Sequence, residues 1–349
     1  MECKKKKILI ADDSALMRRI LCDIISADNR FVVQDMAANG EEAVKLLQEN
    51  TYDAVVLDVI MPKIDGIGVL EKIAQLGIKT SVVVFSTTTT EGAETTIRAL
   101  ELGAFDFMHK PNAILEAKTD RCMEQFISIL ECATNRTQEL REQAEDTRMR
   151  MTAAKTKSRK IVAIASSTGG PKALQAVIPF LSEQIDAPVL IVQHMPPGFT
   201  ASLAQRLNEL SPLHVQEATD GMEIQKGNVY LAQGGKHMEV ISRAGKHYLA
   251  LKDGPTREGV RPCANFMYES LGASDYDSVI CVVLTGMGQD GTQGIQNLSR
   301  QKPIHVIAQE KSTCAVYGMP RSIVASGMVD QIEPLDNIAT AINLNTGVQ

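Results

Sequence analysis

The segment IVAIASSTGGPKAL, which begins at Ile161, places two serines between a run of apolar residues and a run typical of a helix. A strand that turns sharply into a helix can hold a serine out as a nucleophile, and the glycines that follow relieve crowding in the turn. The same Ser-Gly-Gly turn also suits anion binding, because the first backbone amides of the helix point toward it. Taken alone, the segment favours an anion-binding loop over a nucleophile.

Two later segments favour the nucleophile. VLIVQHMPPGFT ends an apolar run with His194, and ICVVLTGMGQDG ends another with a glycine-rich turn that places Asp290 at the start of a helix. If the three runs are strands of one parallel sheet, serine, histidine and aspartate can form a triad in which the histidine removes the serine proton and the aspartate orients the histidine. In isolation, His194 would be a turn residue and Asp290 a helix N-cap. His237 in GGKHMEV is a rival base, although the preceding Gly-Gly suggests a separate hairpin or a loop at the edge of a substrate site.

Carboxylates follow two apolar runs nearer the N-terminus. Asp12 and Asp13 come after KILIA, and Asp58 lies in VVLDVIMPKIDG. Three carboxylates at neighbouring strand ends are costly unless a cation neutralises them, and oxygen ligands with open water positions suit Mg²⁺. Ser86 and Lys110 end the next two runs and add a hydroxyl and an ammonium, so the set could stabilise a transferred phosphoryl group. The alternative is an acidic loop cap with a surface lysine.

Two series of alternating strands and helices must position these residues. The first has the strands KILIA, FVVQDMA, AVVLDVI, SVVVFS and FDFMHK, with helices over 14–27, 40–49, 66–75, 91–102 and about 113–132. The second has IVAIA, APVLIVQH, VYLAQ, SVICVVLTG and PIHVIA, again with helices between them. This alternation predicts two doubly wound α/β domains with mainly parallel sheets. Residues 133–158 are charged and lack aromatic residues, which predicts a linker with transient helix between a core over 1–112, with its helix to about 132, and a domain over 159–349.

The first series resembles a response-regulator receiver domain, which has a flavodoxin-like fold. The matching residues are Asp12, Asp13, Asp58, Ser86 and Lys110, with the MPKIDG turn and the Lys110–Pro111 pair, whose peptide bond is cis in that family. The resemblance implies that Asp58 accepts phosphate from a histidine kinase. It also implies that Asp13, Asp58 and the carbonyl of Ile60 bind Mg²⁺, with Asp12 acting through water. Phe107 falls at the switch-aromatic position of that family.

The second series, over 159–345, resembles the Rossmann-like catalytic domain of the bacterial chemotaxis protein-glutamate methylesterases. The matching segments are SSTGGP, QHMPPGFT, YLAQGGKHM, GVRP and LTGMGQDG. The resemblance implies that Ser167 is the nucleophile, His194 the general base and Asp290 the residue that orients it. Ser166 stands where the family commonly has alanine, and Ala165 where it commonly has glycine. The chain order Ser-His-Asp argues against an ordinary α/β-hydrolase, whose order is Ser-Asp-His.

The implied activity is phosphorylation-controlled hydrolysis of glutamate methyl esters on chemoreceptors, together with deamidation of receptor glutamines, and no cofactor is needed for the hydrolysis. Methylated chemoreceptors and a chemotaxis histidine kinase are the expected partners. The backbone amides of Thr168, Gly169 and Met287 are candidates for stabilising an oxyanion. The receiver is expected to block the active site until Asp58 is phosphorylated.

Composition limits the other possibilities. The net charge of −6 and the pI of about 5.6 argue against a nucleic-acid-binding protein, and a transcription factor is disfavoured because the second half has no helix-turn-helix pattern or basic face. The apolar run after Lys7 is too short for a signal peptide, and no run approaches a membrane span. The seven cysteines form no CxxC pair, which fits reduced thiols in the cytoplasm. A receiver-controlled module whose Ser-Gly-Gly loop only binds an anion stays as the alternative function.

Overall fold

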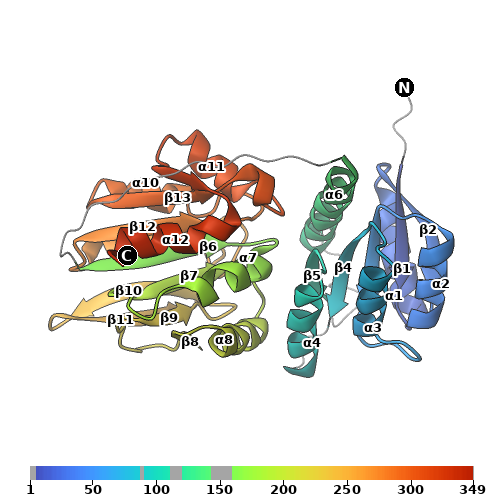
Figure 1. The fold of residues 1–349 in the computed structure, drawn as a ribbon, viewed down its shortest axis with the longest axis horizontal. Coiled ribbons are helices and arrows are strands. Elements are labelled where there is room, and N and C mark those ends of the chain that lie inside the picture. The colour runs from blue at the N-terminus through green and yellow to red at the C-terminus, as the bar shows by residue number, and fades with distance from the viewer. Residues whose placement is uncertain (1–4, 87–89, 111–119, 143–158, 349) are drawn as a thin grey trace. The chain divides into compact units, whose positions relative to one another are not determined.

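The chain forms two α/β units, residues 1–148 and 149–349, each with a mainly parallel sheet and helices on both faces (Figure 1). The computed structural model describes residues 5–86, 90–110, 120–142 and 159–348. The predicted fold class is confirmed. The predicted domain limits stay a prediction, because much of the expected linker lies outside the described residues. Within the described ranges, no helix is long and apolar enough to cross a membrane.

The first unit contains a five-stranded parallel sheet with the order β2-β1-β3-β4-β5. Its elements are β1 (Lys6–Ala11), α1 (Ala15–Ala27), β2 (Phe31–Ala37), α2 (Gly40–Glu49), β3 (Ala54–Asp58), α3 (Gly66–Gln75), β4 (Ser81–Ser86), α4 (Thr90–Glu101), β5 (Asp106–His109) and α6 (Asp120–Glu142). Apolar residues of α1 and α6 pack together with one face of the sheet in a single core. The central strands β3 and β4 are buried throughout, as expected for a parallel sheet covered on both faces, whereas the edge strand β2 is only partly buried.

Local capping explains where several of these helices begin. Ser14 accepts a hydrogen bond from the amide of Met17 and caps α1, and Asp65 accepts one from Gly68 and caps α3. The side chain of Asn39 caps α2 by accepting from the amide of Glu42, at 3.0 Å. These contacts satisfy amides that the helices leave unpaired at their first turns. The predicted ranges of α1, α2, α3 and α4 agree with the observed ranges to within one residue.

The end of α6 was predicted wrongly. The helix continues to Glu142, so residues 133–142, which the sequence assigned to a linker, are helical. Ala133 is fully buried in the core, and the buried hydroxyl of Thr137 donates to Oγ of Ser81 on β4 at 2.7 Å. Threonine and charged residues obscure this continuation in the sequence, because its described contacts include a buried polar pair besides the buried Ala133. The predicted start of the helix near 113 lies outside the described residues.

The second unit contains a seven-stranded parallel sheet with the order β14-β13-β12-β6-β7-β9-β8, and a separate antiparallel hairpin, β10-β11. Its strands are β6 (Lys160–Ser166), β7 (Val189–Gln193), β8 (His214–Glu217), β9 (Asn228–Leu231), β10 (His237–Arg243), β11 (Lys246–Lys252), β12 (Ser278–Val283), β13 (Ile304–Gln309) and β14 (Gln331–Glu333). Its helices are α7 (Gly170–Val177), α8 (Phe199–Leu210), α9 (Ala264–Ser270), α10 (Thr292–Ser299), α11 (Met319–Ala325) and α12 (Leu335–Thr346), with short 3-10 turns over Ile178–Phe180, Leu271–Ala273 and Lys311–Thr313.

The first strand of this sheet, β6, lies between β7 and β12. The strand order therefore reverses at β6, and in open α/β sheets ligands bind beyond the carboxyl ends of the strands at such a switch point. The five strands predicted from apolar runs are present. The short edge strands β8 and β14 were missed, because each has only three or four residues and little apolar character.

Candidate active site and phosphorylation site

Ser167 and His194 follow the ends of two neighbouring parallel strands. Ser166 on β6 pairs in register with Gln193 on β7, and the amide of His194 donates to the carbonyl of Ser166 at 3.1 Å. Adjacent strands lie about 5 Å apart. The register therefore places the two residues side by side at the carboxyl edge of the sheet. Oγ of Ser167 makes no hydrogen bond within the described ranges, and contacts between nucleophile and base often tighten only when substrate binds.

The two adjacent serines have different environments. Ser166 is fully buried, and its hydroxyl donates to Oε1 of Gln193 at 2.7 Å. Ser167 is partly exposed at the start of the turn. A nucleophile must be reached by its substrate, so the exposure of the two side chains favours Ser167 over Ser166.

The turn after Ser167 depends on two glycines. Gly169 has a φ of +74°, a left-handed conformation that glycine adopts without strain, and Gly170 begins α7. A Cβ on Gly170 would lie 1.9 Å from Oε1 of Gln193, so a larger residue there would displace the glutamine. The amides of Thr168 and Gly169 have no backbone acceptor within the described ranges, and they lie at the N-terminal end of α7, where negative charge is favoured.

The third oxyanion candidate, Met287, follows Gly286, which packs directly against the serine. A Cβ on Gly286 would lie 2.8 Å from Cβ of Ser167, so only glycine allows this approach. In the described part of the chain, the amide of Met287 also lacks a backbone acceptor. The backbone therefore offers unpaired donors on both sides of Ser167.

Asp290 meets His194 in a buried hydrogen bond. Nε2 of His194 lies 2.7 Å from Oδ2 of Asp290, and the side chains are 10% and 3% exposed. The pair brings together two of the three residues that the sequence singled out. Since a carboxylate only accepts, Nε2 is the donor in this bond, and in a neutral imidazole Nδ1 then has the lone pair.

Four further donors hold the carboxylate of Asp290. The amide of Ala264 donates to Oδ2 at 2.6 Å, and Oδ1 accepts from the amide of Asn265 at 3.0 Å, from the amide of Gly291 at 2.8 Å and from Sγ of Cys263 at 3.0 Å. Burial opposes the charged form, but these bonds and His194 outweigh it and lower the pKa of Asp290. The carboxylate is therefore ionised and fixed in place at the start of α9.

Asn265 links this arrangement to the next helix. Its Oδ1 accepts from the amides of Gly291 and Gly294 at 3.1 and 2.6 Å, and its Nδ2 donates to Glu258 at 2.8 Å. Burial and the charge of Asp290 raise the pKa of Glu258. Sequence reasoning missed Gln193, Cys263 and Asn265 as supporting residues. The only signal was that Gln193 is the first residue of the segment QHMPPGFT and that Cys263 directly follows GVRP.

His237, the rival base, lies at the start of the predicted hairpin. It is 3% exposed, and its Nε2 donates to the carbonyl of Pro255 at 3.0 Å. Its ring packs against Phe266, with ring centroids 4.5 Å apart. These contacts give His237 a structural role, in which it holds the loop at Pro255 against the hairpin.

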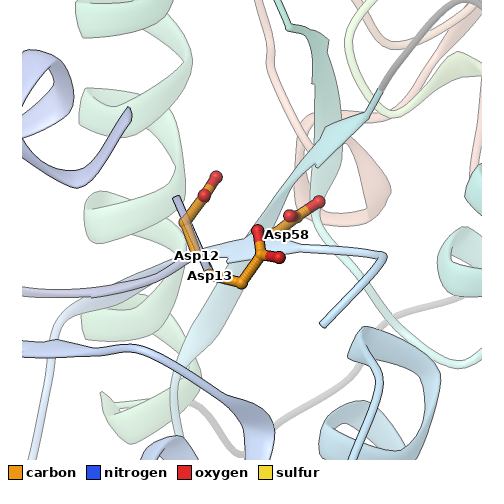
Figure 2. A group of neighbouring side chains, drawn as sticks. All are labelled: Asp12, Asp13 and Asp58. Atoms are coloured by element: carbon orange, nitrogen blue, oxygen red, sulfur yellow. The ribbon is translucent and has the colours of Figure 1, made fainter. Parts of the chain in front are cut away.

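In the first unit, the three predicted carboxylates gather at the ends of β1 and β3 (Figure 2). One oxygen from each of Asp12, Asp13 and Asp58 lies within 4.8 Å of the others. Asp12 and Asp58 are buried, whereas Asp13 is exposed. Burial is the largest cause that raises the pKa of Asp58, and the charge of Asp12 adds to it while Lys110 opposes it. A divalent cation would relieve this excess of negative charge, and an all-oxygen donor set fits Mg²⁺.

Lys110 lies at the same site, as predicted from its place after β5. Its Nζ is 2.8 Å from Oδ2 of Asp12 and 2.6 Å from Oδ2 of Asp58. Although burial opposes the charged form, the two carboxylates outweigh it and raise the pKa of Lys110. Ile60 is 58% exposed, and its amide donates to Oδ1 of Asp58 at 3.3 Å. Pro111 lies outside the described residues.

The two predicted switch residues are buried. Ser86 is 2% exposed, and its hydroxyl donates to the carbonyl of Gly92 at the start of α4 at 3.1 Å. Phe107 is 9% exposed on β5, and its amide donates to Oδ1 of Asp106 at 2.9 Å. The Ser86 hydroxyl thus connects the end of β4 to α4.

Both parts of the chain match known families. The CheB methylesterase family matches residues 162–342, and the response regulator receiver domain matches residues 8–119. The chain is 39% identical over 348 residues to a protein-glutamate methylesterase/protein-glutamine glutaminase of Syntrophomonas wolfei, covering 97% of this chain and 98% of that protein. It is 38% identical to the Bacillus subtilis protein of the same name, covering 96% and 97%. The crystal structure of the Thermotoga maritima CheB methylesterase catalytic domain is similar to 53% of this chain, with 97% of that chain covered, 43% identity and a TM-score of 0.51.

A receiver domain joined to an α/β hydrolytic domain with an Asp-His pair beside a strand-end serine defines a response-regulator hydrolase. The chain belongs to the CheB methylesterase family. It is an enzyme of the protein-glutamate methylesterase/protein-glutamine glutaminase class, which agrees with the family expected from its sequence.

Proposed function

We propose that Ser167, His194 and Asp290 hydrolyse γ-glutamyl methyl esters on chemoreceptors through an acyl-enzyme. The observation that supports this most directly is the buried hydrogen bond between His194 and Asp290 at the strand end adjoining Ser167. Nδ1 of His194 takes the proton of Ser167 as its oxygen attacks the ester carbonyl. The same proton then goes to the methoxy oxygen, and methanol leaves.

Water completes the reaction on the other half of the cycle. His194 removes a proton from water, the resulting hydroxide attacks the acyl carbonyl, and Ser167 leaves with the proton returned to it. The amides of Thr168, Gly169 and Met287 stabilise the oxyanion that forms in each half. Receptor glutamine enters the same route with ammonia as the leaving group, which gives deamidation.

The first experiment separates the two serines. Release of methanol from methylated receptor by the full-length protein should fall by about 10⁴-fold or more in Ser167→Ala. Ser166→Ala should lose no more than about tenfold, because its hydroxyl is buried and donates to Gln193 instead of reaching a substrate. Near-normal turnover by Ser167→Ala would refute the assignment of Ser167 as the nucleophile. Complete loss of turnover in Ser166→Ala, with turnover kept in Ser167→Ala, would refute it too. An anion-binding module would show no turnover in any of these proteins.

We also propose that Asp58 is the phosphoryl acceptor and that Mg²⁺ binds beside it. Asp13, Asp58 and the carbonyl of Ile60 would hold the ion, with Asp12 acting through water, and the ion would neutralise charge on the transferred group. Lys110 contacts the carboxylate of Asp58, and after phosphorylation its ammonium would contact an oxygen of the phosphoryl group instead. A chemotaxis histidine kinase is the proposed phosphodonor, and the cytoplasm is the proposed location because both partners would present their sites there.

Phosphorylation is proposed to activate the hydrolase by relieving inhibition by the receiver. Ser86 and Phe107 are the residues through which a phosphoryl group on Asp58 would change the receiver surface, because the Ser86 hydroxyl would exchange the carbonyl of Gly92 for a phosphoryl oxygen. A small phosphodonor with Mg²⁺ should raise the methylesterase rate of the full chain. The same treatment should leave Asp58→Ala at its basal rate, and equal stimulation of both proteins would contradict the proposal.

A further inference from the structure

Gln193, the last residue of β7, makes every polar contact of its side chain inside the protein. It is 1% exposed, and its Nε2 donates to the carbonyl of Ser167 at 2.9 Å and to the carbonyl of His194 at 3.1 Å. Its Oε1 accepts from the hydroxyl of Ser166 at 2.7 Å. One amide group therefore connects the backbone of the proposed nucleophile to the backbone of the proposed base.

We propose that Gln193 is a positioning residue for the hydrolytic reaction and that Ser166 acts through it by donating to its amide oxygen and so holding the amide in place. The proposal rests on the roles assigned above to Ser167 and His194. Gln193 contacts neither of their reacting atoms. Its effect is to hold the two peptide groups at a fixed separation, so that Oγ of Ser167 and Nδ1 of His194 are presented to each other.

The hydrogen bonds of the amide explain why a serine hydroxyl beside it stabilises the arrangement. If the amide were turned over, Oε1 would face the carbonyls of Ser167 and His194, and three acceptors would meet in a buried site without a donor. The two carbonyls therefore select the orientation seen, and the hydroxyl of Ser166 gives the buried Oε1 a donor, so that this acceptor is not left unpaired. Gly170 leaves the necessary room, because a Cβ there would lie 1.9 Å from Oε1.

The other side of the serine turn is held by Thr285, which follows β12. The amide of Ser167 donates to the carbonyl of Thr285 at 3.0 Å, and the hydroxyl of Thr285 donates to the carbonyl of Thr168 at 3.0 Å. The carbonyls of the turn are thus paired on both sides, by Gln193 and by Thr285. Within the described residues, the amides of Thr168 and Gly169 have no backbone acceptor and are the proposed donors to a substrate oxygen.

Displacement of a catalytic group by about 1 Å costs about 10²-fold in rate, which sets the expected effect. In the full-length, phosphodonor-activated enzyme, Gln193→Met should lower kcat for methanol release by about 10²-fold and change KM by less than about threefold. Ser166→Ala, which removes one hydrogen bond, should lower kcat by about 3- to 10-fold. The folded fraction of each variant, measured by far-UV circular dichroism, allows kcat to be expressed per folded molecule.

A double-mutant cycle tests whether Ser166 acts through Gln193. In the Gln193→Met background, Ser166→Ala should cost less than about twofold, because the amide oxygen to which Ser166 donates is gone. Ser270→Ala is the matched control: it removes a hydroxyl that accepts from the amide of Val240 and donates to the carbonyl of Met267, and it should leave kcat unchanged.

Three results would overturn the proposal. A Gln193→Met enzyme with kcat within twofold of wild type would show that the glutamine does not position the site. If a smaller folded fraction explained the whole loss in Gln193→Met, the glutamine would contribute only to stability. If Ser166→Ala lowered kcat equally in both backgrounds, Ser166 would not act through Gln193. Failure of the underlying function would look different, because Ser167→Ala would then retain activity.

Discussion

Replacing Asp290 with asparagine tests the proton route directly, because it keeps the shape of the side chain and reverses one hydrogen bond. The three donors at Oδ1, namely the amides of Asn265 and Gly291 and the thiol of Cys263, require an acceptor, so the new amide nitrogen must occupy the Oδ2 position. There it donates to Nε2 of His194, which moves the imidazole proton to Nδ1. Nδ1 can then no longer accept the proton of Ser167.

The size of both effects follows from these contacts. An aspartate-to-asparagine change that selects the wrong tautomer costs about 10⁴-fold in kcat in a serine protease, and the same order is expected here. The amide of Ala264, which donates to Oδ2 at 2.6 Å, would also lose its acceptor. One buried unpaired amide costs about 1–3 kcal/mol, which corresponds to a fall in Tm of roughly 2–12 °C for a unit of this size.

The assay is methanol release from methylated receptor, with Tm measured by calorimetry on the same samples. Asp330→Asn is the matched control, because Asp330 also accepts from a buried backbone amide, that of Val306 at 2.7 Å, and lies 3.7 Å from Nδ1 of His305. It should retain full activity. A rate for Asp290→Asn within tenfold of wild type would refute the proton route, whereas a tenfold loss in the control would show that the effect is not specific to the site.

Three other predictions concern the phosphorylation site, the carboxylate of Asp290 and the contact between α6 and β4. Incubation with a small phosphodonor should label the protein only when Mg²⁺ is present, and stoichiometric labelling of Asp58→Ala would place the acceptor elsewhere. Because its pKa is lowered in the folded state, ionised Asp290 stabilises the fold above about pH 4 and this contribution is lost as pH falls through the folded-state value, so the Tm gap between wild type and Asp290→Asn should narrow below about pH 4. A gap that widens on acidification would contradict the sign. Thr137→Val should destabilise the receiver by about 1 kcal/mol in urea unfolding, because it breaks the bond to Ser81, and an unchanged midpoint would mean that α6 is held by apolar contacts alone.

The parts of the fold that the sequence predicted are those with a strong local signal. The buried strands read as apolar runs ended by turn residues, and the chemistry-bearing residues Asp58, Lys110 and His194 stand at or just after those ends. Parallel pairing then requires the residues at the ends to share one edge of each sheet. Alternation and strand ends therefore predicted the edge of each sheet at which a site lies, whereas the choice of Ser167 as nucleophile came from the family resemblance.

The supporting residues could not be predicted in this way, because their roles depend on contacts between segments distant in the sequence. Cys263 lies 27 positions before Asp290, and Gln193 lies 26 positions after Ser167. A buried glutamine at the end of a strand has the same local pattern whether it fills space or joins two carbonyls. The orientation of its amide is fixed only by the partners that the folded chain brings to it.

The order in which the proposed triad occurs along the chain has a structural origin. The strand that carries the serine, β6, comes first and lies at the centre, with β7 on one side and β12 on the other. The next strand in sequence supplies His194 from one side, and the chain must form the outer strands and the hairpin before β12 supplies Asp290 from the other. In the ordinary α/β-hydrolase order the acid precedes the histidine, so the two arrangements place the same three groups around a central serine by different strand orders. The Ser-His-Asp order therefore follows from the strand order, because the chain adds β7 on one side of β6 before it adds β12 on the other. The chemistry requires only that the side chain of histidine lie between those of serine and aspartate.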